Sequence, residues 1–151
     1  MIKRIKSIFN GFGAPRLPVQ AEAFDAGQVD SGNGLTEAEL NDILSAVKPF
    51  TMVHESGVRF GMQQVLQAVE RNVPGVIVEC GVWRGGCSLA MLLAQRKKFG
   101  RVVRPVYMLD SFQGLSPVTT RDGPLARHWQ EGADPPNFFE NCTASKDDLQ
   151  N

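Results

Sequence analysis

The sequence predicts an α/β fold in which a partial parallel sheet follows two N-terminal helices. The run VIVEC at 76–80 is short, apolar and β-branched, as in a strand that is buried on both faces. Glycines and then a helical pattern follow at 81–94, and VYMLD at 106–110 forms a second strand pattern. Strand, helix and strand within this length predict a right-handed βαβ crossover.

Two amphipathic helices are expected before the first strand. In TEAELNDILSAV, residues 36–47, Thr36 and Glu39 fit a capping box, and apolar residues recur every three or four positions until Pro49. A second helical pattern covers about 56–71 and ends at the Asn, Pro and Gly that follow. Both helices therefore precede the first strand.

Other stretches of the chain lack this regular pattern. Residues 10–34 are rich in glycine, proline, alanine and aspartate, so residues 1–34 are expected to form a flexible tail and the folded part is 35–151. The tail opens with MIKRIKSIF, an amphipathic pattern that suits a membrane surface or a partner, whereas a frayed terminus is the ordinary outcome. Prolines interrupt 116–137, where 125–129 fit a brief helical turn, and the final residues, 138–151, fit a helix.

Composition favours a small-molecule partner. Sixteen basic and sixteen acidic side chains cancel, so no global charge attracts nucleic acid or an anionic membrane. The three cysteines, Cys80, Cys87 and Cys142, have no CxxC spacing, which argues against a disulfide framework or a structural zinc site and favours a reducing, cytoplasmic setting. No run reaches the roughly 18 to 20 apolar residues of a membrane-spanning helix, so no membrane span is expected.

The glycine turn after the first strand is the expected ligand site. Ligands of open α/β sheets bind beyond the carboxyl ends of the strands, where Gly81, Gly85 and Gly86 would let a ligand approach the backbone. Asp110, at the end of the second strand, is placed to accept hydrogen bonds from ribose hydroxyls, and Glu79 adds a second carboxylate. Two carboxylates favour a ligand with a positive centre, such as S-adenosylmethionine, over NAD. The spelling GVWRGG also departs from the dinucleotide pattern GxGxxG.

Two longer stretches resemble the macrocin O-methyltransferase family. They are TMVHESGVRFGMQQVLQAVERNVPGVIVECGVWRGG and VYMLDSFQGLS, within about 50–116. The resemblance implies a Rossmann-like class I methyltransferase fold and S-adenosylmethionine-dependent methylation of a sugar hydroxyl on a macrolide or a related small molecule. Residues 35–151 would then be the N-terminal part of a methyltransferase domain. The cofactor-binding residues that it implies are Thr51, Met52, Glu79, Gly81, Arg84, Ser88, Asp110 and Ser111.

The resemblance also implies a role for most of these residues. Glu79 and Gly81 would lie against the methionine part of the cofactor, Ser88 near its carboxylate, and Asp110 on its ribose. The segment 51–52 would close over the cofactor. Arg84 has two alternatives, the cofactor carboxylate or a structural ion pair.

The family's catalytic machinery has no counterpart among these motifs. The resemblance implies a magnesium ion held by acidic residues after later strands, which are expected beyond residue 151, so no metal ligand and no catalytic base is assigned. Two strands also leave a sheet with exposed edges, which favours a truncated product, a completing chain or a homo-oligomer. The alternative to an O-methyltransferase is therefore a catalytically inactive fragment that serves at most as a binding or interaction module.

Several other groups have an ordinary interpretation beside a functional one. His128 is a candidate general base, although a solvated loop histidine is the simpler interpretation, and His54 could approach the cofactor site. Trp83 fits packing better than ligand stacking, and Cys80 and Cys87 fit small buried hydrophobic residues. A basic cluster is expected to form the solvated end of the third helix: Arg96, Lys97, Lys98, Arg101 and Arg104.

Overall fold

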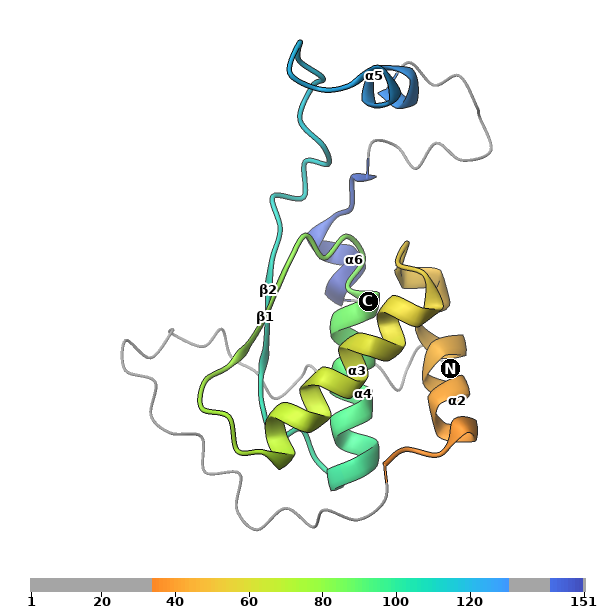
Figure 1. Ribbon diagram of the computed structural model, residues 1–151, viewed down its shortest axis with the longest axis vertical. Helices are drawn as coiled ribbons and strands as arrows, with labels where there is room; N and C mark the ends of the chain where they lie inside the picture. The colour runs from red at the N-terminus through yellow and green to blue at the C-terminus, as the bar shows by residue number, and fades with distance from the viewer. Residues whose placement is uncertain (1–33, 131–141, 151) are drawn as a thin grey trace.

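The computed structural model describes residues 34–130 and 142–150, and these residues form a mixed helix and strand structure (Figure 1). Two short strands pair in parallel and are joined by a helix, which confirms the predicted βαβ crossover and the partial Rossmann-like fold class. The elements in chain order are α2 (Glu37–Val47), the 3-10 helix η2 (Lys48–Phe50), α3 (Glu55–Glu70), β1 (Ile77–Cys80), α4 (Gly86–Phe99), β2 (Val106–Leu109), α5 (Pro124–Gln130) and α6 (Lys146–Gln150).

The first two helices begin and end close to the residues that the sequence indicates. The hydroxyl of Thr36 accepts a hydrogen bond from the backbone N–H of Glu39, and the Glu39 carboxylate accepts one from the backbone N–H of Thr36 at 3.0 Å, so the capping box is confirmed. The start of α3 has a cap that the sequence analysis did not anticipate. The His54 ring accepts a hydrogen bond from the backbone N–H of Ser56 at 3.3 Å, so this histidine is a helix N-cap.

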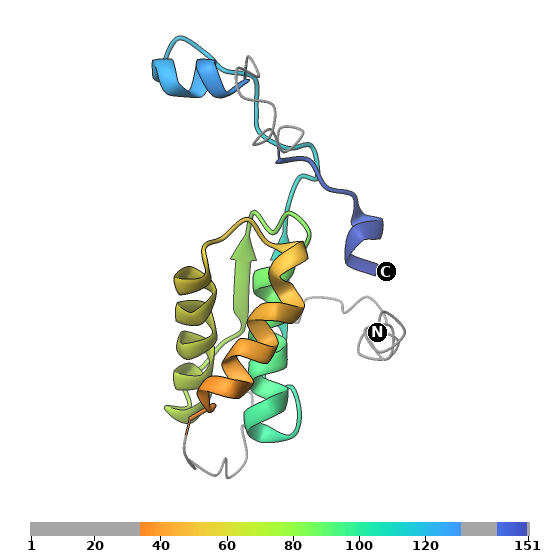
Figure 2. The same cartoon turned by 90° about the vertical axis from the view of Figure 1, so that its right-hand side faces the viewer.

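Helices α2, α3 and α4 lie together on one side of the two-stranded sheet, as two perpendicular views show (Figures 1 and 2). Their apolar faces form the main core, against which Ile77 of β1 also packs. Its buried members are Leu40, Ile43, Val47, Val58, Met62, Val65, Leu66, Ala90 and Ala94.

The strand register separates the residues of the sheet into two faces. Ile77 pairs with Val106 and Cys80 with Leu109, so alternate residues of both strands share a face. Ile77 faces the helices, whereas Val78 and Leu109, on the other face, are 51% and 57% exposed. Burial on both faces, expected for the first strand, is therefore wrong for the described residues, because the helices that they form cover one face only. Cys80 is likewise exposed and not buried.

The basic cluster after α4 is divided between solvent and core. Arg96 and Lys97 in the last turn of α4 are exposed, as expected, but Arg104 is only 2% exposed. Its guanidinium donates a hydrogen bond to the backbone carbonyl of Gly75 at 2.8 Å. The expectation that Arg104 belongs to a solvated helix end is wrong, because this side chain turns inward between the segments that lead into the two strands.

Helix α5 lies away from the main helices and the sheet in both views (Figures 1 and 2), and it confirms the brief helical turn predicted near 125–129. Leu125 on this helix is 82% exposed. Helix α6 confirms the helix expected near the end of the sequence for residues 146–150 only, since residues 143–145 are not helical. The expectations for residues 1–33, for the prolines at 135–136 and for residues 138–141 lie outside the described residues. Within the described ranges, no helix has the length and apolarity needed to cross a membrane.

Candidate functional site

The glycine turn connects β1 to α4 at the carboxyl ends of both strands. Its backbone takes up three left-handed residues within five positions: Gly81 at φ +78°, Trp83 at φ +50° and Gly85 at φ +76°. The N–H of Gly81 donates to the carbonyl of Leu109 at 2.8 Å, and that of Gly85 donates to the carbonyl of Val82 at 2.8 Å. The turn is therefore compact and attached directly to the end of β2.

Asp110 joins the glycine turn to the end of β2. One oxygen of its carboxylate accepts hydrogen bonds from the backbone N–H groups of Val82 at 2.7 Å and Trp83 at 3.1 Å. The other accepts from the N–H of Phe112 at 2.7 Å, and these bonds, that of Phe112 first, lower the pKa of Asp110 below its usual range. Because a carboxylate oxygen has two lone pairs, the oxygen bonded to Phe112 keeps capacity for one further donor, such as a hydroxyl.

Glu79 and Ser88 contact each other on the helix side of the sheet. The Ser88 hydroxyl and backbone N–H both donate to the Glu79 carboxylate. Since Gly85, the N-cap of α4, has no side chain, Glu79 takes over the capping of that helix from the neighbouring strand. Partial burial raises the pKa of Glu79 above its usual range, against the opposing effect of the Ser88 hydrogen bonds.

Residues Phe50 and Thr51 cross the start of α4. A Cβ atom on Gly86 would lie 2.6 Å from the carbonyl carbon and oxygen of Phe50, so only glycine fits there. The Thr51 hydroxyl lies 3.4 Å from the Cys87 sulfur and accepts a hydrogen bond from the backbone N–H of Val53 at 3.0 Å. The segment that was expected to close over a cofactor therefore does lie beside the glycine turn.

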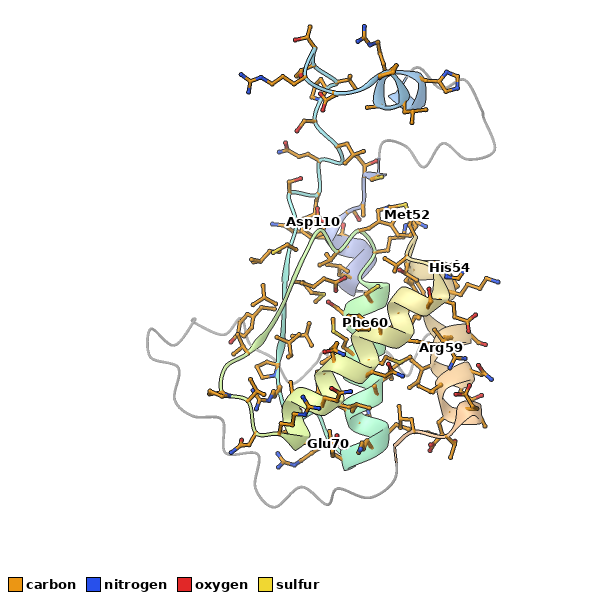
Figure 3. All side chains as sticks on the ribbon, viewed as in Figure 1. Met52, His54, Arg59, Phe60, Glu70 and Asp110 are labelled. Atoms are coloured by element: carbon orange, nitrogen blue, oxygen red, sulfur yellow. The ribbon has the colours of Figure 1, made fainter. Side chains whose placement is uncertain are left out.

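Met52 follows this crossing, and its side chain is 41% exposed. Figure 3 shows Met52 and Asp110 at the same end of the part formed by the sheet and helices α2 to α4, whereas the labelled Glu70 lies at the opposite end of this part. An apolar side chain and a carboxylate are thus both available at the carboxyl end of the sheet.

The three glycines of the turn differ in the space beside them. A Cβ on Gly85 would meet the Leu149 side chain of α6 at 2.5 Å, and one on Gly86 would meet the Phe50 backbone. A Cβ on Gly81 would meet nothing within 4 Å. Close approach by a ligand, which was expected at all three glycines, is thus wrong for Gly85 and Gly86, where the chain's own residues occupy the space.

The side chains of Trp83 and Arg84 contact each other at the glycine turn. The indole N–H of Trp83 donates to the carbonyl of Thr143 at 3.1 Å, and the Arg84 guanidinium carbon lies 4.7 Å from the centre of the indole ring. Trp83 thus packs between the turn and the segment before α6, in agreement with the interpretation as a packing residue. Arg84 stacks on this ring, and among the residues that the structure describes it makes no salt bridge within 4.0 Å.

Three further candidate residues, Ser111, His128 and His54, are exposed to solvent. Ser111 is exposed, and its hydroxyl accepts a hydrogen bond from the backbone N–H of Gln113 at 3.2 Å. His128 is exposed on α5, and His54 caps α3. In the parts of the chain that the structure describes, no three His, Cys, Asp or Glu side chains are grouped so that they could hold a metal ion.

The fold and the site define the class of protein. A parallel βαβ unit has a glycine turn at the carboxyl end of its first strand, and an acidic residue after the second strand accepts hydrogen bonds from that turn, an arrangement typical of a Rossmann-like fold. The family model described as Macrocin-O-methyltransferase (TylF) matches residues 40–132. The chain therefore belongs to the macrocin O-methyltransferase family.

Three relatives have similar sequences over shorter stretches. The chain is 48% identical over 47 residues to the 8-demethyl-8-(2,3-dimethoxy-alpha-L-rhamnosyl)-tetracenomycin-C 4'-O-methyltransferase of Streptomyces olivaceus. This match covers 31% of this chain and 18% of the relative. It is 40% identical over 62 residues to the mycinamicin III 3''-O-methyltransferase of Micromonospora griseorubida, a match that covers 40% of this chain and 24% of the relative. It is 43% identical over 61 residues to the demethyldecarbamoylnovobiocin O-methyltransferase of Streptomyces niveus, a match that covers 38% of this chain and 23% of the relative.

These matches span less than a quarter of each relative's length. No solved structure matches the chain.

Proposed function

We propose that residues 35–151 form the N-terminal, cofactor-binding part of an S-adenosylmethionine-dependent O-methyltransferase that acts on a hydroxyl of a sugar or a related small molecule. Family membership and the names of the three relatives support the reaction type. The name of one relative includes a rhamnosyl group, which supports a sugar as the acceptor.

The clamp formed by Asp110 is the observation that carries this proposal. It holds the ends of β1 and β2 side by side and leaves the backbone of Gly81 open to solvent between them. A ribose hydroxyl would donate to the Asp110 oxygen that is bonded to the N–H of Phe112 alone. The adenosine part of the cofactor would then lie across Gly81, at the carboxyl end of the sheet.

Charge at this end of the sheet suits a sulfonium ligand. The Asp110 carboxylate is negative at neutral pH, and the backbone hydrogen bonds that lower its pKa stabilise this charged form, which attracts a cationic centre. The Glu79 carboxylate accepts a hydrogen bond from Ser88 at the start of α4. We therefore propose that the methionine part of the cofactor lies against Glu79 at this helix start. Within such a site, catalysis consists mainly of holding the methyl group in line with the acceptor hydroxyl.

The described residues do not fit a magnesium site. The family resemblance implies this ion, but no group of three ligating side chains is present in the described ranges. No step of the proposed reaction is therefore assigned to a metal held by these residues.

Calorimetric titration with S-adenosylhomocysteine tests the proposal. We expect saturable binding to the 151-residue chain and loss of binding in Asp110→Ala. Asp122→Ala is the matched control, because Asp122 also accepts from a backbone N–H, that of Thr119 at 2.7 Å, but in a loop outside the glycine turn. Circular dichroism verifies that each variant is folded.

Two results would contradict the proposal. Tighter binding of NAD than of S-adenosylhomocysteine would assign the turn to a dinucleotide. Failure of the folded chain to bind S-adenosylhomocysteine would instead favour a catalytically inactive module with a family sequence but without its cofactor site.

A further inference from the structure

A buried polar cluster lies at the end of the sheet opposite the glycine turn. Gln95 of α4 is 0% exposed, and Arg104, in the segment that leads into β2, is 2% exposed. The Gln95 side-chain oxygen accepts hydrogen bonds from the backbone N–H groups of Val103 at 3.1 Å and Arg104 at 2.7 Å. Its amide nitrogen donates to the carbonyl of Arg104 at 3.1 Å. One side chain therefore fixes the backbone that enters β2.

Arg104 extends this connection to the other strand. Its guanidinium donates to the carbonyl of Gly75, which lies two residues before β1, at 2.8 Å. The N–H of Ile77 donates to the carbonyl of Pro105 at 3.3 Å. The starts of the two strands are therefore joined through a side chain and through the backbone.

The cluster is costly to keep buried. The Nε and Nη2 atoms of Arg104 are buried without a hydrogen-bond partner in the described part of the chain. A buried guanidinium with unused donors lowers stability relative to an apolar side chain of similar volume. Buried polar groups of this kind are best attested as devices that select one register among alternatives.

We infer that Gln95 and Arg104 set the register of β2 against β1 and thereby bring Asp110 to the glycine turn. Only four residues, those of β2, separate Pro105 from Asp110, so fixing the start of this strand fixes its end. A slip of two residues, which keeps the same side chains on each face of the sheet, would move Asp110 by about 6.6 Å along the strand. The hydrogen bonds of 2.7 and 3.1 Å to Val82 and Trp83 would then be lost.

Sheet pairing alone specifies this register weakly. Each strand has four residues, and only the face toward the helices is covered in the described ranges. Burial of one face opposes a slip of one residue, because that slip would turn the apolar side chains toward solvent. A slip of two residues keeps the same side chains on the covered face, and a pair of four-residue strands has few interactions that oppose it. Gln95 and Arg104 are accordingly positioning residues, and this inference concerns the alignment of two strands and does not rest on the proposed methyl transfer.

Disulfide trapping measures the register directly. Cys80 pairs with Leu109 across the two strands, and both are exposed on the same face, so Leu109→Cys places a second thiol beside Cys80. A slip of two residues would bring Tyr107 or Ser111 opposite Cys80 instead. The variants Leu109→Cys, Tyr107→Cys and Ser111→Cys are oxidised separately, and mass spectrometry identifies which pair with Cys80.

We expect only Leu109→Cys to bridge efficiently while Gln95 and Arg104 are intact. With Gln95→Leu or Arg104→Met added, the bridge to position 109 should be lost and a bridge to 107 or 111 gained. Arg104→Lys keeps a donor for the Gly75 carbonyl and should retain the original bridge. Met62→Ala, a substitution in the helical core, controls for lost stability and should leave the bridging pattern unchanged.

The inference is overturned if position 109 remains the dominant partner of Cys80 in both Gln95→Leu and Arg104→Met. Where Gln95→Leu fails to fold, Gln95→Asn replaces it, because its shorter side chain cannot bond both backbone N–H groups and the carbonyl of Arg104 from the same Cα position. The ratio of the Cys80 disulfides to positions 109, 107 and 111 is then measured in that variant, with the same expected and contradicting results. A shift of the bridge in Met62→Ala would also overturn the inference, since general loss of stability would then be sufficient.

Discussion

The crossing of Phe50 over the first residue of α4 predicts a large effect from a single methyl group. In Gly86→Ala, the new Cβ would lie 2.6 Å from the carbonyl carbon and oxygen of Phe50 and 2.8 Å from the Cβ of Thr51. The Phe50 atoms are backbone atoms, so a change of side-chain rotamer cannot relieve the overlap. Overpacking of this kind lowers the free energy of unfolding by about 1 to 3 kcal/mol.

Gly61→Ala is a matched control within α3. The nearest atom to its new Cβ would be the Met91 Cγ at 4.0 Å, an ordinary contact. Replacing an interior helical glycine by alanine without a clash should raise the free energy of unfolding by about 0.5 to 1 kcal/mol. The same chemical change is therefore expected to have opposite signs at Gly86 and Gly61.

Urea unfolding followed by far-UV circular dichroism distinguishes the two variants. With an unchanged denaturant slope, the unfolding midpoint should fall for Gly86→Ala and rise for Gly61→Ala. If Gly86→Ala unfolds at the wild-type midpoint or above it, Phe50 does not lie against the start of α4, and the argument that places Thr51 and Met52 beside the glycine turn fails.

Three further predictions concern the groups around the turn. Asp110→Ala removes the acceptor of three backbone N–H groups and should cost about 1 to 2 kcal/mol near neutral pH. Because folding lowers the pKa of Asp110, its contribution to stability is present above the ordinary aspartate pKa and is lost as pH falls through the folded value. The free energies of unfolding of wild type and variant should therefore converge as pH decreases. A difference in stability that stays constant with pH would contradict this. Ser88→Ala removes the hydroxyl hydrogen bond that lowers the pKa of Glu79, so this pKa, already raised by burial, should rise further in a carboxyl-carbon NMR titration; an unchanged value would refute the contact. Since the folded pKa of Glu79 is raised, its contribution to stability is present at low pH and is lost as pH rises through that value. Trp83→Phe keeps an aromatic ring but loses the hydrogen bond to the Thr143 carbonyl, and should lower the free energy of unfolding by about 1 kcal/mol in urea, whereas equal stability would mean that this bond contributes nothing.

Local patterns in the sequence predicted the parts of the fold that depend on neighbouring residues. The capping box of Thr36 and Glu39 placed the start of α2, and helical periodicity placed α3 within one residue at each end. The glycine turn and the adjacent end of β2 were expected to be neighbours, and the hydrogen bonds to Asp110 confirm this. Each of these features is encoded within a short window or by the general geometry of a parallel sheet.

Contacts between distant segments were not predictable in the same way. Nothing near Gly86 in the sequence indicates that Phe50 occupies the space of its missing side chain. Arg104 follows other basic residues and has the pattern of a solvated charge, and Gln95 has no apolar periodicity to distinguish it. Their burial depends on the way that α4 returns the chain to the start of β2, which a residue pattern does not specify.

The contacts that hold the glycine turn also determine when it can form as the chain folds. They join residues that are 28 positions apart for Val82 and Asp110, 36 for Thr51 and Cys87, and 60 for Trp83 and Thr143. Helices can form from local interactions, whereas closing long loops carries an entropic cost that must precede such contacts. The carboxyl end of the sheet should accordingly order after the individual helices α3 and α4, and its backbone amides should exchange with solvent through smaller openings than those of these helices.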